Sequence, residues 1–559
     1  MTKRLVNIPM PPTRAGWNPL TVAVAAGLWI AVFANWPLWQ ALLALPEMSS
    51  TRGAVFVSGF ALMITALLTA LLALAAWRFS IKPVIALFVL AAAFGAHFMG
   101  TYGVVIDSTM MVNVVQTDPR EVRDLLSLRL LFSVLFLAGL PLLLLWRVRL
   151  QRLGALAQLG RNALGFTAAL LVLAALVFAL FADLSATMRN HKSMRYLINP
   201  LNSFYALADI GLRAKARPAG PPLPIGSDAR VAPRAAGARA PLVLLVVGET
   251  ARADHFALNG YERPTNPELA ALDLVSFREV SSCGTNTAAS LPCMFSHLGK
   301  AKFEARERDS ENLLDLVQRV GMAVLWVDNQ AGCKGLCERI PNAQAINAAP
   351  GGTAPGVQIC ENGECLDEAL LVGLDARLAA LPAEQRERGV LLVLHQMGSH
   401  GPAYYKRSPP NRKPFMPECS TNVLQQCERA NLINAYDNSI AYTDHVLAQT
   451  IGWLQGKSAQ YDTTMLYVSD HGESLGENNL YLHGLPYALA PREQTHVPMI
   501  VWAAPTTAPA TQAMTACLRE RRDVPLTHDN LFHSVLGLLG IQAGEYQVGL
   551  DAFAACRGP

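Results

Sequence analysis

The stretch Leu242-Val243-Leu244-Leu245-Val246-Val247, followed directly by Gly248-Glu249-Thr250, decides the fold of the second half of the chain. A near-continuous apolar run of this kind is typical of a strand buried on both faces. Comparable runs, separated by amphipathic helical stretches, occur at 322–327, 390–394, 463–468 and 497–502. We therefore predict that residues 241–559 form an α/β domain with a mainly parallel sheet covered by helices.

Acidic and imidazole side chains follow three of these predicted strands. Glu249 follows the first, His395 and His400 follow the strand at 390–394, and Asp470-His471 follows the strand at 463–468. In open α/β sheets the active site lies at the carboxyl ends of the strands. Carboxylates and imidazoles are ligands for zinc and similar divalent cations. The sequence thus predicts a metal site made by Glu249, Asp470 and His471, with His395 packed as an ordinary strand residue.

A short polar loop between two cysteines, Cys283-Gly-Thr-Asn-Thr-Ala-Ala-Ser-Leu-Pro-Cys293, contains the candidate nucleophile. A threonine in a loop of small residues most often caps a helix or makes a local turn, and Thr285 is interpreted in this way. A hydroxyl group becomes a good nucleophile when it is coordinated to a metal. Together with the predicted ligands, this makes Thr287 the expected covalent nucleophile and a fourth ligand.

The composition divides the 559-residue chain into a membrane part and a soluble part. Hydrophobic residues make up 52% of the sequence, and the excess lies before residue 190. Apolar stretches at 19–45, 54–76, 83–105, 128–146 and 164–186 predict a five-helix transmembrane domain at 1–187. Residues 188–240 are expected to form an interfacial helix and a linker rich in Ala, Pro, Gly and Arg. The net charge of +4, without a basic stripe, predicts no nucleic-acid partner.

All ten cysteines lie after residue 280: Cys283, Cys293, Cys333, Cys337, Cys360, Cys365, Cys419, Cys427, Cys517 and Cys556. An even number in close pairs favours disulfides and an oxidising compartment over structural zinc, for which the spacings 333–337 and 360–365 are the alternative. Basic residues flank the apolar stretches at 3–14, 78–82 and 147–161. The positive-inside rule places these flanks in the cytoplasm and residues 241–559 outside, which agrees with the cysteines.

The polar loop at 102–126 is expected on the same side as the soluble domain. Asn113, Thr117 and Glu121 recur at i, i+4 and i+8 and would share one face of a helix. However, Asp118-Pro119 is typical of a helix start, and Pro119 argues against one unbroken helix through all three residues.

Several motifs together carry a family resemblance: Val247-Gly-Glu-Thr-Ala-Arg252, Asn259-Gly-Tyr261, Thr265-Asn-Pro267, Cys283-Gly-Thr-Asn-Thr287, Pro292-Cys-Met-Phe295, Gly398-Ser-His-Gly-Pro402, Ser469-Asp-His-Gly-Glu-Ser474 and Leu482-His-Gly484. With them the chain resembles the membrane-anchored lipid A phosphoethanolamine transferases of the alkaline phosphatase/sulfatase superfamily. The resemblance covers essentially the whole chain and implies a zinc enzyme in the inner membrane, multi-pass, with its catalytic domain in the periplasm.

The resemblance also implies a reaction. Phosphatidylethanolamine is the expected donor and a phosphate of lipid A the expected acceptor, with a covalent intermediate on Thr287 and diacylglycerol as the first product. We expect at least one zinc ion, allow a second during turnover, and expect a monomer. Masking of negative surface charge predicts lower sensitivity to cationic peptides such as polymyxins.

Individual roles carried over from the family complete these expectations. Glu249, Thr287, Asp470 and His471 are the expected zinc ligands. His400 and His483 are expected at the transferring phosphate, with Lys334 as a phosphate contact. Asn113, Thr117 and Glu121 are expected near the ethanolamine group of the substrate, and the resemblance implies sequential pairing of the ten cysteines.

Three other functions were compared with this one. A phosphoglycerol transferase of the lipoteichoic-acid type shares the five spans and the threonine nucleophile, but it is disfavoured by the disulfide-rich domain. A sulfatase needs a Cys or Ser in a Cys/Ser-x-Pro-x-Arg setting, which Leu291-Pro292-Cys293-Met294 does not supply. A non-catalytic sensor or scaffold predicts gaps in the ligand set. A glycan of the envelope other than lipid A also stays open as the acceptor.

Overall fold

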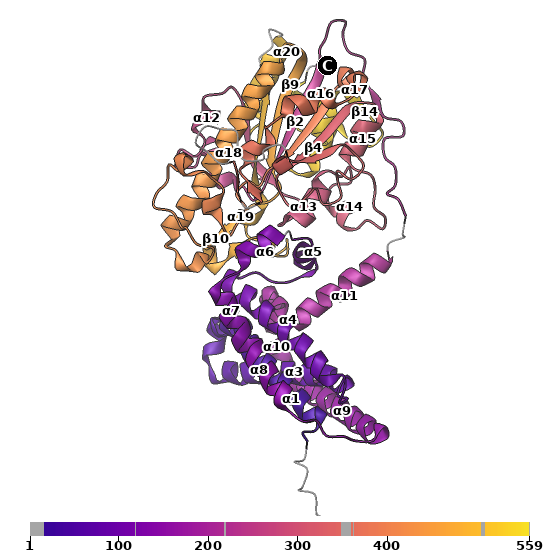
Figure 1. The fold of residues 1–559 in the computed structure, drawn as a ribbon, viewed down its shortest axis with the longest axis vertical. Helices are drawn as coiled ribbons and strands as arrows, with labels where there is room; N and C mark the ends of the chain where they lie inside the picture. The colour runs from indigo at the N-terminus through magenta and orange to yellow at the C-terminus, as the bar shows by residue number, and fades with distance from the viewer. Residues whose placement is uncertain are drawn as a thin grey trace, which may run out of the picture. The chain divides into compact units, whose positions relative to one another are not determined.

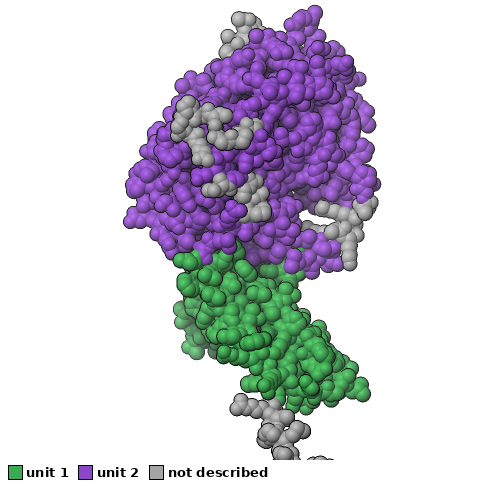
Figure 2. Space-filling model, viewed as in Figure 1, with its two compact units in different colours: residues 1–101, 128–206 green, residues 102–127, 207–559 purple. Residues whose placement is uncertain are grey.

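The computed structural model describes residues 16–117, 119–216, 220–347, 359–361, 363–504 and 509–557, except for the side chains of 119–121, 213–216 and 509–513. The chain forms two compact units. The first consists of residues 1–101 and 128–206, and the second of residues 102–127 and 207–559 (Figure 2). The polar loop at 102–127 therefore belongs to the unit that contains the sheet.

The first unit is a helical assembly. Its elements are α1 (Pro19–Trp29), a π-helical turn (Ile30–Ala34), α2 (Trp36–Leu43), α3 (Thr51–Leu74), α4 (Ile81–Tyr102), α7 (Leu128–Val134), a second π-helical turn (Leu135–Gly139), α8 (Leu140–Arg147), α9 (Ala155–Ala179) and α10 (Phe181–Asn190). Within the described residues, four helices are long and apolar enough to cross a membrane, and the bent pair 19–34 and 36–43 makes a fifth if it counts as one span. The predicted helical transmembrane part is thus confirmed.

The first predicted span is bent rather than a single helix. The two halves meet at 51° around Asn35, whose backbone is not helical. Pro37 favours a new helix start here because it lacks the N–H group that an uninterrupted helix requires. Asn35 is buried and exchanges two hydrogen bonds with Asn199, of 2.7 and 2.8 Å, so its polar groups are satisfied.

The last predicted span, 164–186, begins and ends earlier in the structure. Helix α9 starts at Ala155 and includes polar residues that the apolar stretch left out. Gln158 is buried, and its amide donates to Ala76 O at 2.9 Å and to Asn162 Oδ1 at 2.7 Å, which makes its burial favourable. The helix ends at Ala179, the backbone of Leu180 leaves the helical region, and α10 follows.

The second unit is built on an eight-stranded sheet in the order β13-β3-β12-β9-β2-β8-β4-β5. The strands are β2 (Ala240–Gly248), β3 (Val275–Ser281), β4 (Ala323–Asp328), β5 (Asn342–Gln344), β8 (Val390–His395), β9 (Tyr461–Ser469), β12 (His496–Ala503) and β13 (Leu526–Thr527). All pairs are parallel except those of β12, which is antiparallel to β9 and β3. The mainly parallel sheet and its five predicted strands are confirmed.

Both faces of the sheet are covered, as near-continuous apolar strands require. Val243, Leu245 and Val247 of β2 face a core that includes residues of α13 (Thr287–Met294), α15 (Leu313–Arg319) and α21 (Asp529–Leu539). The alternate residues of β2 face a second core with α16 (Leu374–Ala380) and α18 (Arg429–Lys457). Figure 1 shows α18 and α15 on opposite sides of the sheet.

Residues before β2 are already part of this unit. After α11 (Leu201–Ala216), the short strand β1 (Arg230–Val231) pairs with β14 (Ile541–Gln542), and Ile225 is only 4% exposed. Parts of the stretch predicted as a linker, around Ile225 and Val231, are therefore packed on the sheet domain. The boundaries 1–187, 188–240 and 241–559 stay a prediction.

Five disulfides join the ten cysteines in sequential order: Cys283–Cys293, Cys333–Cys337, Cys360–Cys365, Cys419–Cys427 and Cys517–Cys556. All five lie in the second unit. The disulfide interpretation is confirmed over structural zinc, and the pairing matches the one that the resemblance implies.

Candidate active site

Three neighbouring strands of the sheet bring the predicted metal ligands together. β2 lies between β9 and β8 and runs parallel to both, so the carboxyl ends of the three strands lie at one edge. Glu249 follows β2, and Asp470 and His471 follow β9. All three side chains are fully buried. The adjacency that the sequence predicted from strand ends is therefore present in the fold.

Glu249, Asp470 and His471 form a compact ligand group. Each offers one ligand atom, and the three atoms lie within 4.8 Å of one another. His471 Nε2 lies 3.3 Å from Glu249 Oε1 and 3.4 Å from Asp470 Oδ2. Two carboxylates and one imidazole at these distances are a donor set that a divalent cation can take.

The hydrogen bonding and charge of this group fit a bound cation. Asp470 Oδ2 is buried and accepts no hydrogen bond from any residue that the structure describes. A buried carboxylate oxygen without a partner is strongly unfavourable unless a cation neutralises it. Burial and the nearby Glu249 carboxylate raise the pKa of Asp470 to about 7. A divalent cation at this point would satisfy the oxygen and separate the two negative charges.

Neighbouring groups orient the ligands. His471 Nδ1 lies 2.9 Å from Gly472 O, so Nδ1 carries the hydrogen and Nε2 is free to coordinate. Gln330, which sequence reasoning missed, donates from Nε2 to Glu249 Oε2 at 3.0 Å. Gln330 follows the end of β4, and its backbone N–H donates to Asp328 Oδ1 at 2.9 Å. The sequence signal that could have identified Gln330 is its position just after β4, because the carboxyl end of β4 lies at the same edge of the sheet as the other strand ends.

Thr287 lies directly against the ligand group. Its hydroxyl Oγ1 is 3.1 and 3.2 Å from the two oxygens of Glu249 and 3.4 Å from His471 Nε2. Thr287 is the first residue of α13, and the residue that caps this helix is Asn286, whose side chain accepts from Ala289 N. The capping role expected of a loop threonine is thus taken by Asn286, which leaves the Thr287 hydroxyl directed at Glu249.

Residues distant in sequence hold the loop that contains Thr287 by hydrogen bonds. His528 accepts from Cys283 N at 3.0 Å and donates to Ser469 O at 2.9 Å, so it joins the nucleophile loop to the end of β9. Ser290 of α13 donates to Asp470 O. Thr285 donates to Leu485 O at 2.7 Å, 200 positions away, so its hydroxyl holds a distant loop rather than making the local cap or turn that the sequence predicted.

His400 and His483 lie beside the ligand group. The ring of His483 is 4.3 Å from that of His471 and 5.8 Å from that of His400. His483 Nδ1 lies 3.3 Å from Glu473 Oε1, and burial raises the pKa of Glu473 to about 8. The structure therefore groups both predicted imidazoles with the metal ligands at one edge of the sheet.

Gly398 allows the loop after β8, which contains His400 and is called the His400 loop below, to approach Glu249 closely. Its backbone has φ +54°, and a Cβ at this position would lie 2.6 Å from Glu249 O, so a side chain does not fit. Ser399 N donates to the same oxygen at 3.0 Å. Asp367 holds the loop from the other side, because it accepts from Met397 N at 2.8 Å and Gly398 N at 2.9 Å.

The residues predicted to contact the substrate lie in the second unit. Among the described residues, none of their hydrogen bonds is to Thr287. Lys334 donates to the backbone oxygen of Gln116 at 3.4 Å. Gln116 ends α5 (Ser108–Gln116), which contains Asn113, and Thr117 donates to Asn113 O at 2.8 Å. Helix α6 begins at Pro119 (Pro119–Leu125), so no unbroken helix joins Asn113 to Glu121, as Pro119 predicted. The Glu121 side chain lies outside the described residues, as does Asp118.

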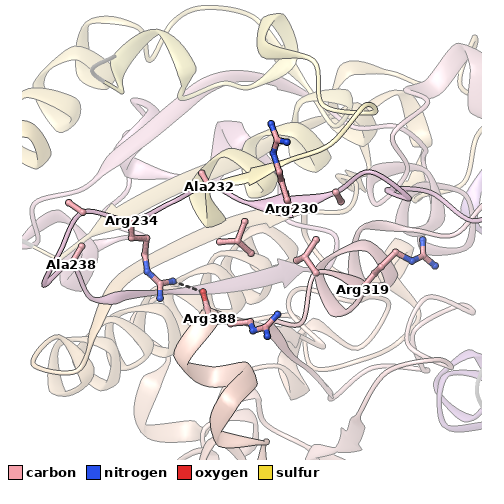
Figure 3. A pocket seen from close by; sticks show the side chains of 10 residues that line it. Arg230, Ala232, Arg234, Ala238, Arg319 and Arg388 are labelled. Atoms are coloured by element: carbon pink, nitrogen blue, oxygen red, sulfur yellow. Dashed lines mark hydrogen bonds between the residues drawn. The ribbon is translucent and has the colours of Figure 1, made fainter.

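A hollow of about 800 Å³ lies at the opposite edge of the sheet (Figure 3). Its lining residues precede β2, β4 and β8, and they include Arg230, Arg234, Arg319 and Arg388. Arg234 donates to the backbone oxygens of Glu387 and Arg388 at 2.7 and 2.6 Å, at the end of α17 (Ala383–Arg388). A guanidinium group on the carbonyl end of a helix stabilises that helix, so Arg234 has a structural explanation apart from the active-site edge.

A candidate metal-ligand group with the Thr287 hydroxyl against it, at the carboxyl edge of a mainly parallel sheet, fits the alkaline phosphatase superfamily. A family model described as "Sulfatase" matches residues 241–541, and one described as "Phosphoethanolamine transferase EptA/EptB" matches residues 64–213.

Similarity to individual proteins extends over the whole chain. The chain is 37% identical to "Phosphoethanolamine transferase EptA" of Escherichia coli K12, over 100% of this chain and 99% of that protein. It is 37% identical to "Phosphatidylethanolamine transferase Mcr-1" of Escherichia coli, over 95% and 97%. Among solved structures, the integral membrane lipooligosaccharide phosphoethanolamine transferase A (EptA) of Neisseria meningitidis matches with a TM-score of 0.87 and 33% identity, over 96% of this chain and 99% of that one. The chain belongs to the lipid A phosphoethanolamine transferase family.

Proposed function

We propose that this protein transfers phosphoethanolamine from phosphatidylethanolamine to a phosphate group of lipid A through a covalent intermediate on Thr287. The names of the relatives support the transferred group and the class of acceptor. The observation that carries the mechanism is the position of the Thr287 hydroxyl, 3.1 and 3.2 Å from the two oxygens of Glu249 and at the first position of α13.

In the first half of the reaction, Thr287 Oγ1 attacks the phosphorus of phosphatidylethanolamine. The new Oγ1–P bond replaces the bond between phosphorus and the glycerol oxygen, and diacylglycerol leaves. Glu249 is the nearest base for the hydroxyl proton of Thr287. His400 supplies a proton to the leaving glycerol oxygen. Burial lowers the pKa of His483 to about 3, so its neutral ring stabilises charge on the transferring group instead, and the two rings lie 5.8 Å apart.

In the second half, a phosphate oxygen of lipid A attacks the phosphorus held on Thr287. The Oγ1–P bond breaks, phosphoethanolamine is joined to the acceptor through a pyrophosphate link, and Thr287 regains a proton. The same residues act in both half-reactions, so one compact group can serve the two lipid substrates in turn.

Glu249, Asp470 and His471 would hold a divalent metal, with Thr287 as a fourth ligand, and we propose zinc because the donor set is carboxylate and imidazole. When bound, the ion supplies positive charge that stabilises the threonine alkoxide and the charge on the transferring phosphoryl group. One such ion satisfies the unpartnered Asp470 Oδ2. We also propose that a second ion could bind beside His400 and His483 during turnover.

Substrate contacts are proposed at two further places. Lys334 contacts the phosphate, since it lies in the same unit and its ammonium group has only backbone oxygens at 3.4 Å as described partners. Asn113, Thr117 and Glu121 contact the ethanolamine group. The Lys334–Gln116 hydrogen bond supports this pairing, because it joins the two predicted contact regions.

The long apolar helices and the membrane-protein relative support a place in the membrane. We propose the inner membrane, with residues 241–559 in the periplasm. A structural match to the C-terminal periplasmic domain of phosphoethanolamine transferase EptC of Campylobacter jejuni supports this side (TM-score 0.51, 37% identity, covering 60% of this chain and 97% of that one). Five disulfides in this part agree with an oxidising compartment. We propose a monomer.

The test is a transfer assay with the purified full chain. Phosphatidylethanolamine with a labelled headgroup is incubated with lipid A, with phosphate-free lipid A, or with another envelope glycan. We expect label on lipid A only when its phosphates are present, and loss of transfer after chelation that zinc reverses. Transfer of a glycerol phosphate group instead, or label on the other glycan alone, contradicts the proposal. In cells, the active protein should lower sensitivity to polymyxin, and Thr287→Ala should not.

A further inference from the structure

The polar segment 102–127 packs onto the loops that carry the active site. A Cβ at Gly103 would lie 3.0 Å from Asn479 O, so the two backbones are in close contact. A Cβ at Gly484 would lie 2.9 Å from Met110 Cε, which places the Met110 side chain over the residue after His483. Helix α5 also contacts α13, the helix that begins with Thr287. The segment therefore reaches the His483 loop and the nucleophile helix.

A buried charged group anchors the far end of this segment. The anchor centres on Asp124 of α6, which is 4% exposed. Its carboxylate lies 3.2 Å from Arg407 Nη2 and accepts from Lys406 Nζ. Asn422 Nδ2 donates to Asp124 O at 2.6 Å. Three residues of the catalytic unit thus converge on one carboxylate residue of the segment.

Arg407 connects this anchor to the active site. It is 7% exposed, and its Nε donates to the backbone oxygen of His400 at 2.9 Å. Its Nη1 lies 3.4 Å from Glu364 Oε2, in the hairpin closed by a disulfide. One guanidinium group therefore joins Asp124, the His400 loop and this hairpin. A planar guanidinium whose three nitrogens each contact a different partner fixes direction as well as distance, which a lysine does not reproduce.

Because the Asp124–Arg407 ion pair is buried, each residue depends on the other for compensation of its charge. Removing one partner of a buried ion pair leaves the other charge uncompensated, which is strongly unfavourable. Displacing the segment would leave Arg407 with only the more distant carboxylate of Glu364 and would disturb the contact that supports His400. The positions of the segment and of the His400 loop are therefore coupled through Asp124 and Arg407.

We propose that Asp124 and Arg407 are positioning residues of the transfer reaction. Their ion pair holds the 102–127 segment over the active-site edge, so that Asn113 and Thr117 reach the headgroup of the donor lipid while His400 keeps its place. This inference rests on the proposed function, because it assigns a role in binding the donor.

The test measures the donor half-reaction with the full chain in detergent micelles. Phosphatidylethanolamine with a fluorescent acyl chain is the substrate, and release of fluorescent diacylglycerol is followed. Asp124→Asn frees the segment but leaves the catalytic groups intact, so KM should rise about tenfold while kcat changes by less than about twofold. Asp124→Glu keeps the carboxylate and should restore most of the wild-type KM.

Arg407→Lys gives a complementary result. Lysine keeps a positive charge for Asp124 but removes the Nε–H group that supports His400 O, so kcat should fall more than KM rises. The control is Asp315→Asn, which breaks another ion pair of the same unit, between the buried Asp315 and the exposed Arg339 at 2.7 Å. This control should lower Tm and leave KM unchanged. Hydrogen exchange should become faster at 108–125 in Asp124→Asn and stay unchanged there in Asp315→Asn.

The outcomes separate the two proposals. No diacylglycerol from the wild-type protein contradicts the proposed function. An active wild type together with an Asp124→Asn variant of wild-type KM and wild-type exchange at 108–125 overturns the positioning role. Equal loss of kcat in Asp124→Asn and Asp315→Asn overturns it as well, because the effect is then general destabilisation. If Asp124→Asn does not fold, Asn422→Ala replaces it: this variant keeps the ion pair, and its KM should rise less than that expected for Asp124→Asn. An unchanged KM in Asn422→Ala contradicts the proposal.

Discussion

Replacing Gln330 with methionine should weaken metal binding without removing a metal ligand. Gln330 Nε2 donates to Glu249 Oε2 at 3.0 Å, and the side chain is 2% exposed, so water does not readily take its place. Methionine has a similar length and no hydrogen-bond donor. The substitution therefore removes one hydrogen bond from a ligand and leaves little cavity behind.

The size of the effect follows from the charge of the acceptor. A hydrogen bond to a charged group contributes about 1.5–3 kcal/mol, and every 1.4 kcal/mol corresponds to a tenfold change in an equilibrium constant. Loss of a partner that orients a metal ligand typically lowers metal affinity by about 10- to 100-fold. We therefore expect the Kd for zinc to rise by about 10- to 100-fold in Gln330→Met.

The assay is competition for zinc between the metal-depleted full chain and a chromogenic chelator. The matched control is Gln158→Met, which removes an equally buried amide from α9 in the other compact unit. Gln158→Met should keep the wild-type Kd even if its stability falls. A folded Gln330→Met protein whose Kd stays within about twofold of wild type would refute this reasoning, because Glu249 would then not depend on its neighbour.

Two further predictions concern stability and its relation to activity. Alanine in place of both cysteines should cost about 4 kcal/mol for Cys517–Cys556 and about 3 kcal/mol for Cys283–Cys293, because the closed loops differ in length. Activity should fall further in the second variant, which frees the loop of the nucleophile, and the reverse order of activities would contradict its role. Although burial opposes it, hydrogen bonds to two glutamates raise the pKa of His445. Its stabilising contribution is therefore fully present below about pH 6.5 and lost as pH rises through the higher folded pKa, so Tm should fall as pH rises above about 6.5 and His445→Gln should flatten that slope.

Sequence patterns predicted those parts of the site that lie at strand ends. Glu249, Asp470 and His471 each follow a buried strand, and parallel strands bring their carboxyl ends to one edge whatever the loops do. Thr287 was harder, because a threonine in a loop of small residues usually caps a helix. The structure resolves this through Asn286, which caps α13 in its place.

The supporting residues could not be predicted in the same way. His528 acts on Cys283 from 245 positions away, and neither residue carries a local pattern that indicates the other. Asp124 and Arg407 form an ion pair across 283 positions, and from sequence each is an ordinary surface charge. Such contacts depend on how loops pack against each other, which hydrophobic periodicity does not specify. The first span shows the same limit in part, since the residue that satisfies Asn35 at its bend is Asn199, 164 positions away.

The covalent intermediate on Thr287 is the central claim, and peptide mass spectrometry tests it most directly. The purified protein is incubated with phosphatidylethanolamine without acceptor, digested, and compared with Thr287→Ala and with the neighbouring Thr285→Ala. The account predicts a phosphoethanolamine adduct on Thr287 in the wild type and in Thr285→Ala, and none in Thr287→Ala or after chelation of the metal. An unmodified Thr287 in a protein that still transfers phosphoethanolamine would contradict the account.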